Sequence, residues 1–529
     1  MRPARSSAIL ALSLAFTLTA CGEGAEESPS SSPDTYADGK TFTLGIGTDP
    51  GALDPQASPV SAALQLGRFA YDSLVTVNGE GEVEPNLATS WEVDGTTVTF
   101  EIGEDITCSD GSDFTAQTVV DNLDYVGDPK NESPFLGVFV PAGAKASASG
   151  STVTMKLAGP SPFVLNGLSN LLLVCDAGMK DRDSLASTSA GTGPYTLEEA
   201  AAGDHYTYKV REDYAWGPGG AKTSETGTPA VIEAKVVTNE TTAANQLTSG
   251  ELNAAGIIGP DAARLAAADI AVEKTALITG EQWYNHAEGR PAADPAVRIA
   301  LTQVLDLAEL QKVITSGTGE PATGLAILEP RACQDDSVAG NLPETDADAA
   351  AAALEDAGWT KGSDGVYAKD GEKLAVTFVH DTALGSGGAA AAELAVKAWN
   401  DFGVDVTAKA ATTAELEPIL FGSGDWDIAW EPINIGTPDQ LVPFLSGPAP
   451  ADGGTNFSGI ENADYTASVE AAMDKTGAEG CDDWAAAEAA LFEAADVVPF
   501  ANNVSQTFHT GADLVVTDVI VPTSIRMHG

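Results

Sequence analysis

The fold class is decided by residues 373–430, which read KLAVTFVHDTALGSGGAAAAELAVKAWNDFGVDVTAKAATTAELEPILFGSGDWDIAW. Short runs rich in β-branched and aromatic residues alternate here with longer stretches whose apolar residues recur at helical spacing. The predicted elements are a strand at 373–379, a helix at 388–402 that stops at Gly403, a strand at 404–409, a helix at 413–421 and a strand at 427–430. Strands that alternate with helices of this length indicate an α/β lobe with a largely parallel sheet.

The sequence on either side adds further elements of both kinds. One amphipathic helix is predicted at 295–314 and another helix at 346–357. The first half of the chain contains predicted strands at 41–47, 151–157 and 231–237, a hairpin at 91–102, and helices at 62–74 and 241–249. A chain of 529 residues is too long for one hydrophobic core, so two or three lobes are expected.

The N-terminus has the features of an export signal. Arg2 and Arg5 precede an apolar run at 9–18 that is too short to span a membrane. The next residues, 18–22, read LTACG and resemble the bacterial lipobox, in which cleavage leaves the cysteine as a lipid-bearing first residue. An ordinary cleaved signal peptide that contains a cysteine is the alternative.

We therefore predict a lipoprotein signal peptide at 1–20, lipidation of Cys21 and a flexible tether at 21–40. The tether is dominated by Gly, Glu, Ser, Pro and Asp, which offer too little apolar surface to order the chain. No later stretch has the length and apolarity of a membrane span. The body of the protein is expected outside the cytoplasm, attached to the cell membrane through its lipid.

The composition is strongly acidic. The chain contains 77 Asp and Glu against 26 Lys and Arg, which gives a formal net charge of −51. Binding to nucleic acid depends on neutralisation of phosphates by Lys and Arg, so a nucleic-acid partner is not expected.

Four cysteines remain besides Cys21, and an even number in an exported chain indicates disulfides: Cys108, Cys175, Cys333 and Cys481. Three pairings are open at this point. A zinc site is the alternative, but the cysteines lack C-x2-C spacing and no pair of histidines lies nearby.

No pattern of residues identifies a catalytic centre. The chain has no G-x-S-x-G motif, and its five histidines lie far apart without metal-ligand spacing. Neither a metal site nor a cofactor is predicted. Two segments instead place large aromatic rings beside polar groups, at 283–286 and at 426–434, as pockets for organic solutes do.

The order of motifs resembles the family-5 extracellular solute-binding proteins of ABC transporters, the group that binds peptides and nickel. The motifs that carry this resemblance are LDP at 53–55, YDSLV at 71–75, EPNLATSWEV at 84–93, DGSDFTAQTVV at 110–120, GTGPY at 191–195, LTSGEL at 247–252 and GDWD at 424–427. The resemblance extends from about residue 42 to beyond residue 500.

The resemblance implies a type II periplasmic-binding-protein fold with two lobes, a hinge and an extra subdomain in the first lobe. The implied domains are lobe I at 41–280 with its subdomain at about 76–190, lobe II at 281–500, and a C-terminal return to lobe I at 501–529. Within these lobes the favoured disulfides are Cys108–Cys175 and Cys333–Cys481. The implied function is capture of a small solute between the lobes and its delivery to permease subunits, by a monomer and without catalysis.

Two departures from the family bear on the solute. Peptide-binding members carry an aspartate that pairs with the peptide's amino terminus, and the matching position here is Ile433 or Gly436. The family's Asn before its Arg-Pro step is Ala287 here. A peptide is therefore only the default solute, and blocked peptides, amino-acid derivatives, opines, oligosaccharides and siderophores stay open.

The candidate ligand contacts are chosen by chemistry and relative position: Trp283, Tyr284, Trp430, Glu431, Asn434, Asn456 and Phe457. The rings would wall the solute, while Glu431 and the two asparagines would orient it. Two other functions remain as alternatives, a secreted lipid-anchored hydrolase and a surface protein that senses a ligand without transporting it.

Overall fold

The computed structural model describes residues 35–529, apart from residues 59, 258–260, 269 and 453. The predicted signal peptide, Cys21 and residues 21–34 of the predicted tether lie outside the described residues. Residues 35–40 pack against the C-terminus, where Tyr36 forms a β-bridge with His528 and donates a hydrogen bond to Asp513. In the described ranges, no helix combines the length and apolarity that crossing a membrane requires.

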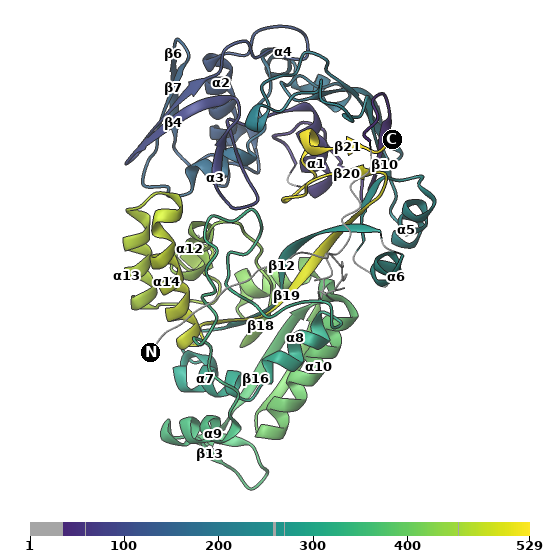
Figure 1. Ribbon diagram of the computed structural model, residues 1–529. Coiled ribbons are helices and arrows are strands. Elements are labelled where there is room, and N and C mark those ends of the chain that lie inside the picture. The colour runs from purple at the N-terminus through teal and green to yellow at the C-terminus, as the bar shows by residue number, and fades with distance from the viewer. Residues whose placement is uncertain (1–34, 59, 258–260, 269, 453) are drawn as a thin grey trace, which may run out of the picture.

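A mixed sheet of ten strands runs through the described part of the molecule (Figure 1). Its strands, in spatial order, are β17 (Asp405–Ala411), β16 (Ala375–Asp381), β18 (Ile428–Trp430), β12 (Ala271–Tyr284), β19 (Val497–His509), β11 (Ala254–Gly256), β1 (Thr41–Ile46), β10 (Val231–Val236), β9 (His205–Val210) and β8 (Tyr195–Ala201). We call the part built on β1 and β8–β11 lobe I, and the part built on β16–β18 lobe II. The long strands β12 and β19 pair with each other and extend from one lobe into the other.

The parallel sheet predicted for the second half is present in part. β16 pairs in parallel with both β17 and β18, and β1 pairs in parallel with both β10 and β11. The remaining pairs, which involve β8, β9, β12 and β19, are antiparallel. Each lobe therefore has a parallel centre, and the antiparallel pair β12–β19 joins the two centres.

Helices cover the sheet in both lobes. In lobe I, α1 (Ser61–Ala70) packs Phe69 against Phe42 of β1, and α5 (Glu240–Ser249) and α6 (Asp261–Ala267) cover β11 and β19. In lobe II, α7 (Pro295–Gln303), α8 (Leu307–Ile314), α9 (Ala347–Asp356) and α10 (Gly385–Phe402) share one core with β16 and β18. A second core of lobe II lies under α11 (Thr413–Pro418), α12 (Val442–Leu445), α13 (Ala463–Met473) and α14 (Cys481–Glu493).

An inserted subdomain forms a separate four-stranded sheet in the order β4-β5-β7-β6. Its elements are β4 (Ala88–Asp94), β5 (Thr97–Ile102), β6 (Lys145–Ser149), β7 (Thr152–Lys156), α2 (Ala116–Gly127) and α3 (Val164–Asn170). A small hairpin of β2 (Val75–Val77) and β3 (Val83–Pro85) precedes it. In Figure 1 this subdomain lies above α12, α13 and α14 of lobe II.

The single helix predicted at 295–314 is wrong, because the structure divides it into α7 and α8. Asp306 lies between them, and its side chain accepts a hydrogen bond from the backbone N–H of Glu309. This interaction caps the start of α8 and so ends the continuous helix. The apolar spacing did not reveal the break because both helices bury their apolar faces in the same core.

The helix predicted at 413–421 also changes form before its end. The α-helix α11 ends at Pro418, and residues Ile419–Ser423 continue as a π-turn. Proline lacks the N–H that a regular helix needs, which explains the altered hydrogen-bond pattern.

Two disulfides join the cysteines as predicted, Cys108 to Cys175 and Cys333 to Cys481. The first ties the loop after β5 to the residue before α4 (Asp176–Lys180). The second ties an irregular segment of lobe II to the first residue of α14. Each disulfide joins residues of a single lobe, the first in lobe I and the second in lobe II.

Candidate functional site

The directions of the strands place one edge of each lobe opposite the other. β12 runs from lobe I into lobe II, and β18 lies antiparallel to it, with Gln282 beside Trp430. The carboxyl ends of β18, β16 and β17 therefore point toward lobe I. Likewise β11 lies antiparallel to β19, with Ala254 beside His509, so the carboxyl ends of β11, β1 and β10 point toward lobe II. In α/β proteins ligands bind at the carboxyl ends of parallel strands, and here both sets of ends face each other.

Two carboxyl groups lie at this edge of lobe II. Glu431 directly follows β18, and its Oε2 is buried without a hydrogen-bond partner among the described residues. Burial and, to a smaller extent, the negative charge of Asp381 at the end of β16 together raise the pKa of Glu431 to about 7. A group that is half in its charged form near neutral pH can accept a proton or a cationic solute group with little reorganisation.

Glu281, on β12, is the second carboxyl group and is fully buried. One of its oxygens accepts a hydrogen bond from the backbone N–H of Ile433 at 2.7 Å. Burial and, to a smaller extent, the nearby carboxylates of Glu431 and Glu488 together raise the pKa of Glu281 to about 8. The buried carboxyl group of Glu281 thus joins β12 to the loop after β18.

The tryptophans and the tyrosine predicted to contact ligand are fully buried. Trp283 donates a hydrogen bond to the backbone oxygen of Glu431 at 2.9 Å, and Trp430 donates one to Gln282 at 3.0 Å. The hydroxyl of Tyr284 lies 2.7 Å from the Gln282 amide nitrogen, which donates to it. Tyr284 and Trp430 lie in one core of lobe II and Trp283 in the other, so the structure does not bring the three rings together in one pocket.

The remaining predicted contacts lie in two loops. Asn434 is exposed, and its amide pairs with both backbone groups of Ile278 on β12, at 2.7 and 3.1 Å. Asn456 is buried and uses its amide to hold the loop at Gly447 and Ile460. Phe457 packs its ring 5.0 Å from that of Trp283.

Glu281 was not predicted as a site residue, although its position in the sequence is unusual. Glu281 is the one charged residue in the run 275–284, which reads TALITGEQWY. This run leads into the aromatic segment predicted at 283–286. A carboxyl group inside an apolar strand is uncommon unless it is paired or functional.

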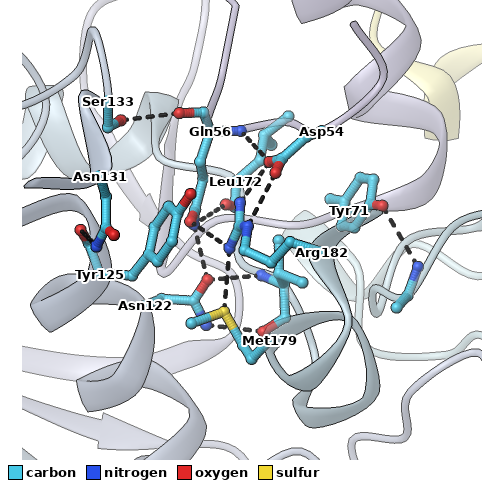
Figure 2. Close-up of polar contacts among 12 residues, drawn as sticks. Asp54, Gln56, Tyr71, Asn122, Tyr125, Asn131, Ser133, Leu172, Met179 and Arg182 are labelled. Carbon is cyan, nitrogen blue, oxygen red and sulfur yellow. Dashed lines mark hydrogen bonds and ion pairs between the residues drawn. The ribbon is translucent and has the colours of Figure 1, made fainter. Parts of the chain in front are cut away.

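The loop that follows β1 forms the opposite edge, on lobe I, and Figure 2 shows how it is held. Asp54 of the LDP motif forms an ion pair with Arg182, whose Nε donates to Asp54 at 2.8 Å. The guanidinium of Arg182 also lies over the ring of Tyr125, 3.8 Å from its centroid. Gln56 donates to Asn122 of α2 at 2.7 Å. Asp54 therefore fastens the loop to the inserted subdomain rather than presenting a free charge (Figure 2).

The two lobes touch at their rims. Phe163 of the inserted subdomain is buried in the same apolar cluster as Trp484 of α14, with ring centroids 6.1 Å apart. The backbone N–H of Gly477 donates to the backbone oxygen of Pro162 at 2.9 Å. On lobe I a pocket of about 80 Å³ lies next to Arg68, Tyr71 and Asn86. Pro330 of lobe II forms part of its wall.

The described residues contain no group of three or more His, Cys, Asp and Glu side chains arranged to hold a metal ion. Two lobes joined by two shared strands, with strand ends that face each other, define the class of two-lobed binding proteins with the type II periplasmic-binding-protein fold.

The chain belongs to the bacterial extracellular solute-binding proteins, family 5, because the model of that family matches residues 82–451. Solute binding is the property that names this family.

Comparison with characterised proteins gives distant relatives. The glutathione-binding protein GsiB of Escherichia coli K12 is 27% identical over 293 residues, which are 54% of this chain and 56% of GsiB. The chain thus spans about half the length of the curated relatives that it matches.

Solved structures match nearly the whole chain. A substrate-binding protein from Microbacterium hydrocarbonoxydans, in complex with 4-hydroxybenzoate hydrazide, is 27% identical with a TM-score of 0.68. The match covers 92% of this chain and 100% of that one. The ABC transporter substrate-binding protein CtaP of Listeria monocytogenes is 19% identical with a TM-score of 0.76, over 93% of this chain and 100% of its own. The second likeness establishes the fold alone.

Proposed function

We propose that this chain is the lipid-anchored subunit of an ABC importer that captures a peptide or similar small organic solute and delivers it to the permease, without catalysis. The observation that carries the proposal is the opposed set of strand ends, with the buried carboxyl groups of Glu281 and Glu431 at one edge. GsiB is named for binding glutathione, and the Microbacterium protein was solved with an aromatic hydrazide. Both solutes are small and carry amide-like groups.

The proposed mechanism is a shift between open and closed arrangements of the lobes. A solute that lies between the lobes contacts both of them only when they are closed, so its binding favours the closed form. The hinge is β12 and β19, whose pairing is irregular between Ile278 and Glu281. The domains that move are lobe I at 41–280 with 501–529, and lobe II at 281–500. Cys21 would hold the protein to the membrane through two or more lipid chains.

The proposed solute contacts lie in the loop after β18. Glu431 and Asn434 would meet the solute. Trp283, which donates to the backbone of Glu431, and Phe457, which packs on Trp283, would hold this loop in place. Tyr284 and Trp430 would support the strands beneath it through Gln282, and Asn456 would hold the neighbouring loop at 447–460. The unpartnered oxygen of Glu431 suits an amino group of the solute.

We expect wild-type protein to bind at least one member of a panel of short peptides that includes glutathione, as measured by calorimetry. Binding should lower the radius of gyration in X-ray scattering, because the lobes close. Scattering profiles that stay unchanged across peptides, glutathione and aromatic amides would contradict the proposed function.

Glu431→Gln should weaken binding of amine-bearing solutes by roughly 10- to 100-fold, because a hydrogen bond to a charged group contributes about 1.5–3 kcal/mol. Glu470→Gln on α13 changes an exposed carboxyl group and is the matched control. Equal affinities for both variants and wild type would show that Glu431 does not meet the solute.

Phe163→Ala should favour the open form, because it removes the aromatic contact that buries Phe163 in lobe II. Replacing a buried phenylalanine by alanine typically reduces stability by about 3–5 kcal/mol. Part of this reduction affects only the closed form, in which Phe163 contacts lobe II. Scattering of solute-free protein should show a larger radius of gyration. Phe139→Ala, which removes a ring stacked on Phe135 within the subdomain, should leave the radius unchanged. The opposite pattern would place the lobe contact elsewhere.

A further inference from the structure

The pocket on lobe I is small and is completed by lobe II. The C-terminal part of α1, the end of β2, the end of α3 and the loop at 517–523 surround it, and Pro330 closes it from lobe II. Its volume of about 80 Å³ has room for roughly five to eight waters. A single ring system fits this space.

The apolar part of the wall combines two aromatic rings with proline and aliphatic side chains, the aliphatic ones being Val77, Val519, Ile520 and Val521. Tyr71 and Tyr214 line the pocket, together with four prolines: Pro194, Pro218, Pro330 and Pro522. Tyr71 and Tyr214 are buried and hence held in place. The two tyrosine rings favour a planar ring, which can stack on them or pack edge-on against them.

The charged groups that line the pocket are already engaged. Arg68 donates to the backbone oxygen of Ser169 at 3.0 Å and to Asn170 at 2.7 Å, and it lies 4.0 Å from Asp518. A charged solute would therefore have to displace existing partners of Arg68.

Asp72 is similarly occupied. It is buried and accepts hydrogen bonds from Thr192 at 3.0 Å, Tyr214 at 3.2 Å and Trp216 at 3.3 Å. Burial raises its pKa, which makes a full negative charge less available. An uncharged solute suits this pocket better than an ionised one.

Asn86 is a polar group of the pocket with unused hydrogen-bonding capacity. Its Oδ1 is buried and has no hydrogen-bond partner among the described residues. An unpaired buried acceptor is unfavourable, and a solute N–H or O–H would satisfy it.

We propose that this pocket is a specificity subsite for an uncharged planar ring that bears an amide or hydroxyl group, with the ring against Tyr71 and Tyr214 and the polar group on Asn86. The proposal rests on the proposed solute-binding function and deepens it, since Pro330 lets such a ring contact both lobes at once. Ring-bearing solutes would thereby promote closure.

Benzamide is the probe that tests this subsite, with benzoate as its charged counterpart and cyclohexanecarboxamide as its non-planar counterpart. Calorimetry on the full mature chain should show benzamide binding at least tenfold more tightly than either. Asn86→Leu should weaken benzamide binding about tenfold, which corresponds to about 1.4 kcal/mol. Asn131→Leu, at an exposed site of the subdomain, should not. Circular dichroism and thermal melts confirm that both variants are folded.

Benzoate or cyclohexanecarboxamide binding as tightly as benzamide would overturn the proposal, as would equal benzamide affinities of Asn86→Leu and wild type. Glutathione and short peptides distinguish a failure of the subsite from a failure of the proposed function. If they bind and close the protein while benzamide does not, the subsite fails and the proposed function stands. If no solute binds or changes the scattering, the proposed function itself fails.

Discussion

Glu281→Gln should make the protein more stable at neutral and alkaline pH and should remove much of the fall in its stability with rising pH. Burial raises the pKa of Glu281 from 4.5 to about 8, so between these values the folded protein holds a proton that the unfolded chain has released. Stability then falls as pH rises, because the folded state binds more protons than the unfolded state. The loss begins near pH 4.5, continues to about pH 8 and is level above it.

The size of this effect follows from the difference in pKa. At about 1.36 kcal/mol for each unit, one carboxyl group shifted this far reduces stability by at most about 5 kcal/mol at pH 8. Glutamine keeps an oxygen for the backbone N–H of Ile433 and carries no charge at any pH. The stability of the variant should keep a smaller dependence on pH, because the pKa of Glu431 is also raised.

The measurement is the free energy of unfolding by urea at intervals from pH 5 to pH 9. Glu251→Gln, at an exposed carboxyl group, is the matched control and should follow wild type throughout. A wild-type stability that stays constant from pH 5 to pH 8 would show that Glu281 is ionised in the folded protein.

Removing the Cys333–Cys481 disulfide by the double substitution Cys333→Ser and Cys481→Ser should reduce stability by about 4–5 kcal/mol. The bond spans 148 residues, and cross-links that close long loops restrict the unfolded chain most. It also fastens to α14 the segment that carries Pro330, which completes the pocket on lobe I.

Urea denaturation under non-reducing conditions measures this loss. The matched control replaces Cys108 and Cys175 by serine in the same way. Their bond spans 67 residues and lies outside lobe II. That variant should lose stability but keep the affinity of wild type for solutes that depend on lobe II. If the Cys333 and Cys481 variant unfolds at the wild-type urea concentration, the bond does not constrain the unfolded chain.

Most of the secondary structure could be predicted because it depends on local chemistry. The helix α5 begins at Asn239, whose side chain caps it, and ends at Gly250, which adopts a positive φ of 76°. Both residues signal helix ends in any sequence. The break between α7 and α8 was missed since an aspartate such as Asp306 fits a helix interior and a cap almost equally.

The site was harder to predict, and the aromatic residues show why. Trp283 and Trp430 stand beside polar residues, as pocket rings do, but the structure buries both completely. A ring in a core and a ring in a pocket bury similar apolar area, and the sequence pattern is the same. The role of Asn86 could not be predicted from the sequence, because the lack of a hydrogen-bond partner for its Oδ1 depends only on the residues that surround it in the fold.

The amino-acid sequence alone determined the α/β class, the family, the favoured pairs of cysteines and the absence of a recognisable catalytic motif. These follow from periodicity, spacing and motif order, which are properties of the chain itself. The tertiary structure alone decided that β12 and β19 join the lobes, that Glu281 is buried at their junction and that Pro330 completes a pocket on the opposite lobe. Burial and pairing of this kind depend on residues far apart in the chain, so a local pattern cannot express them.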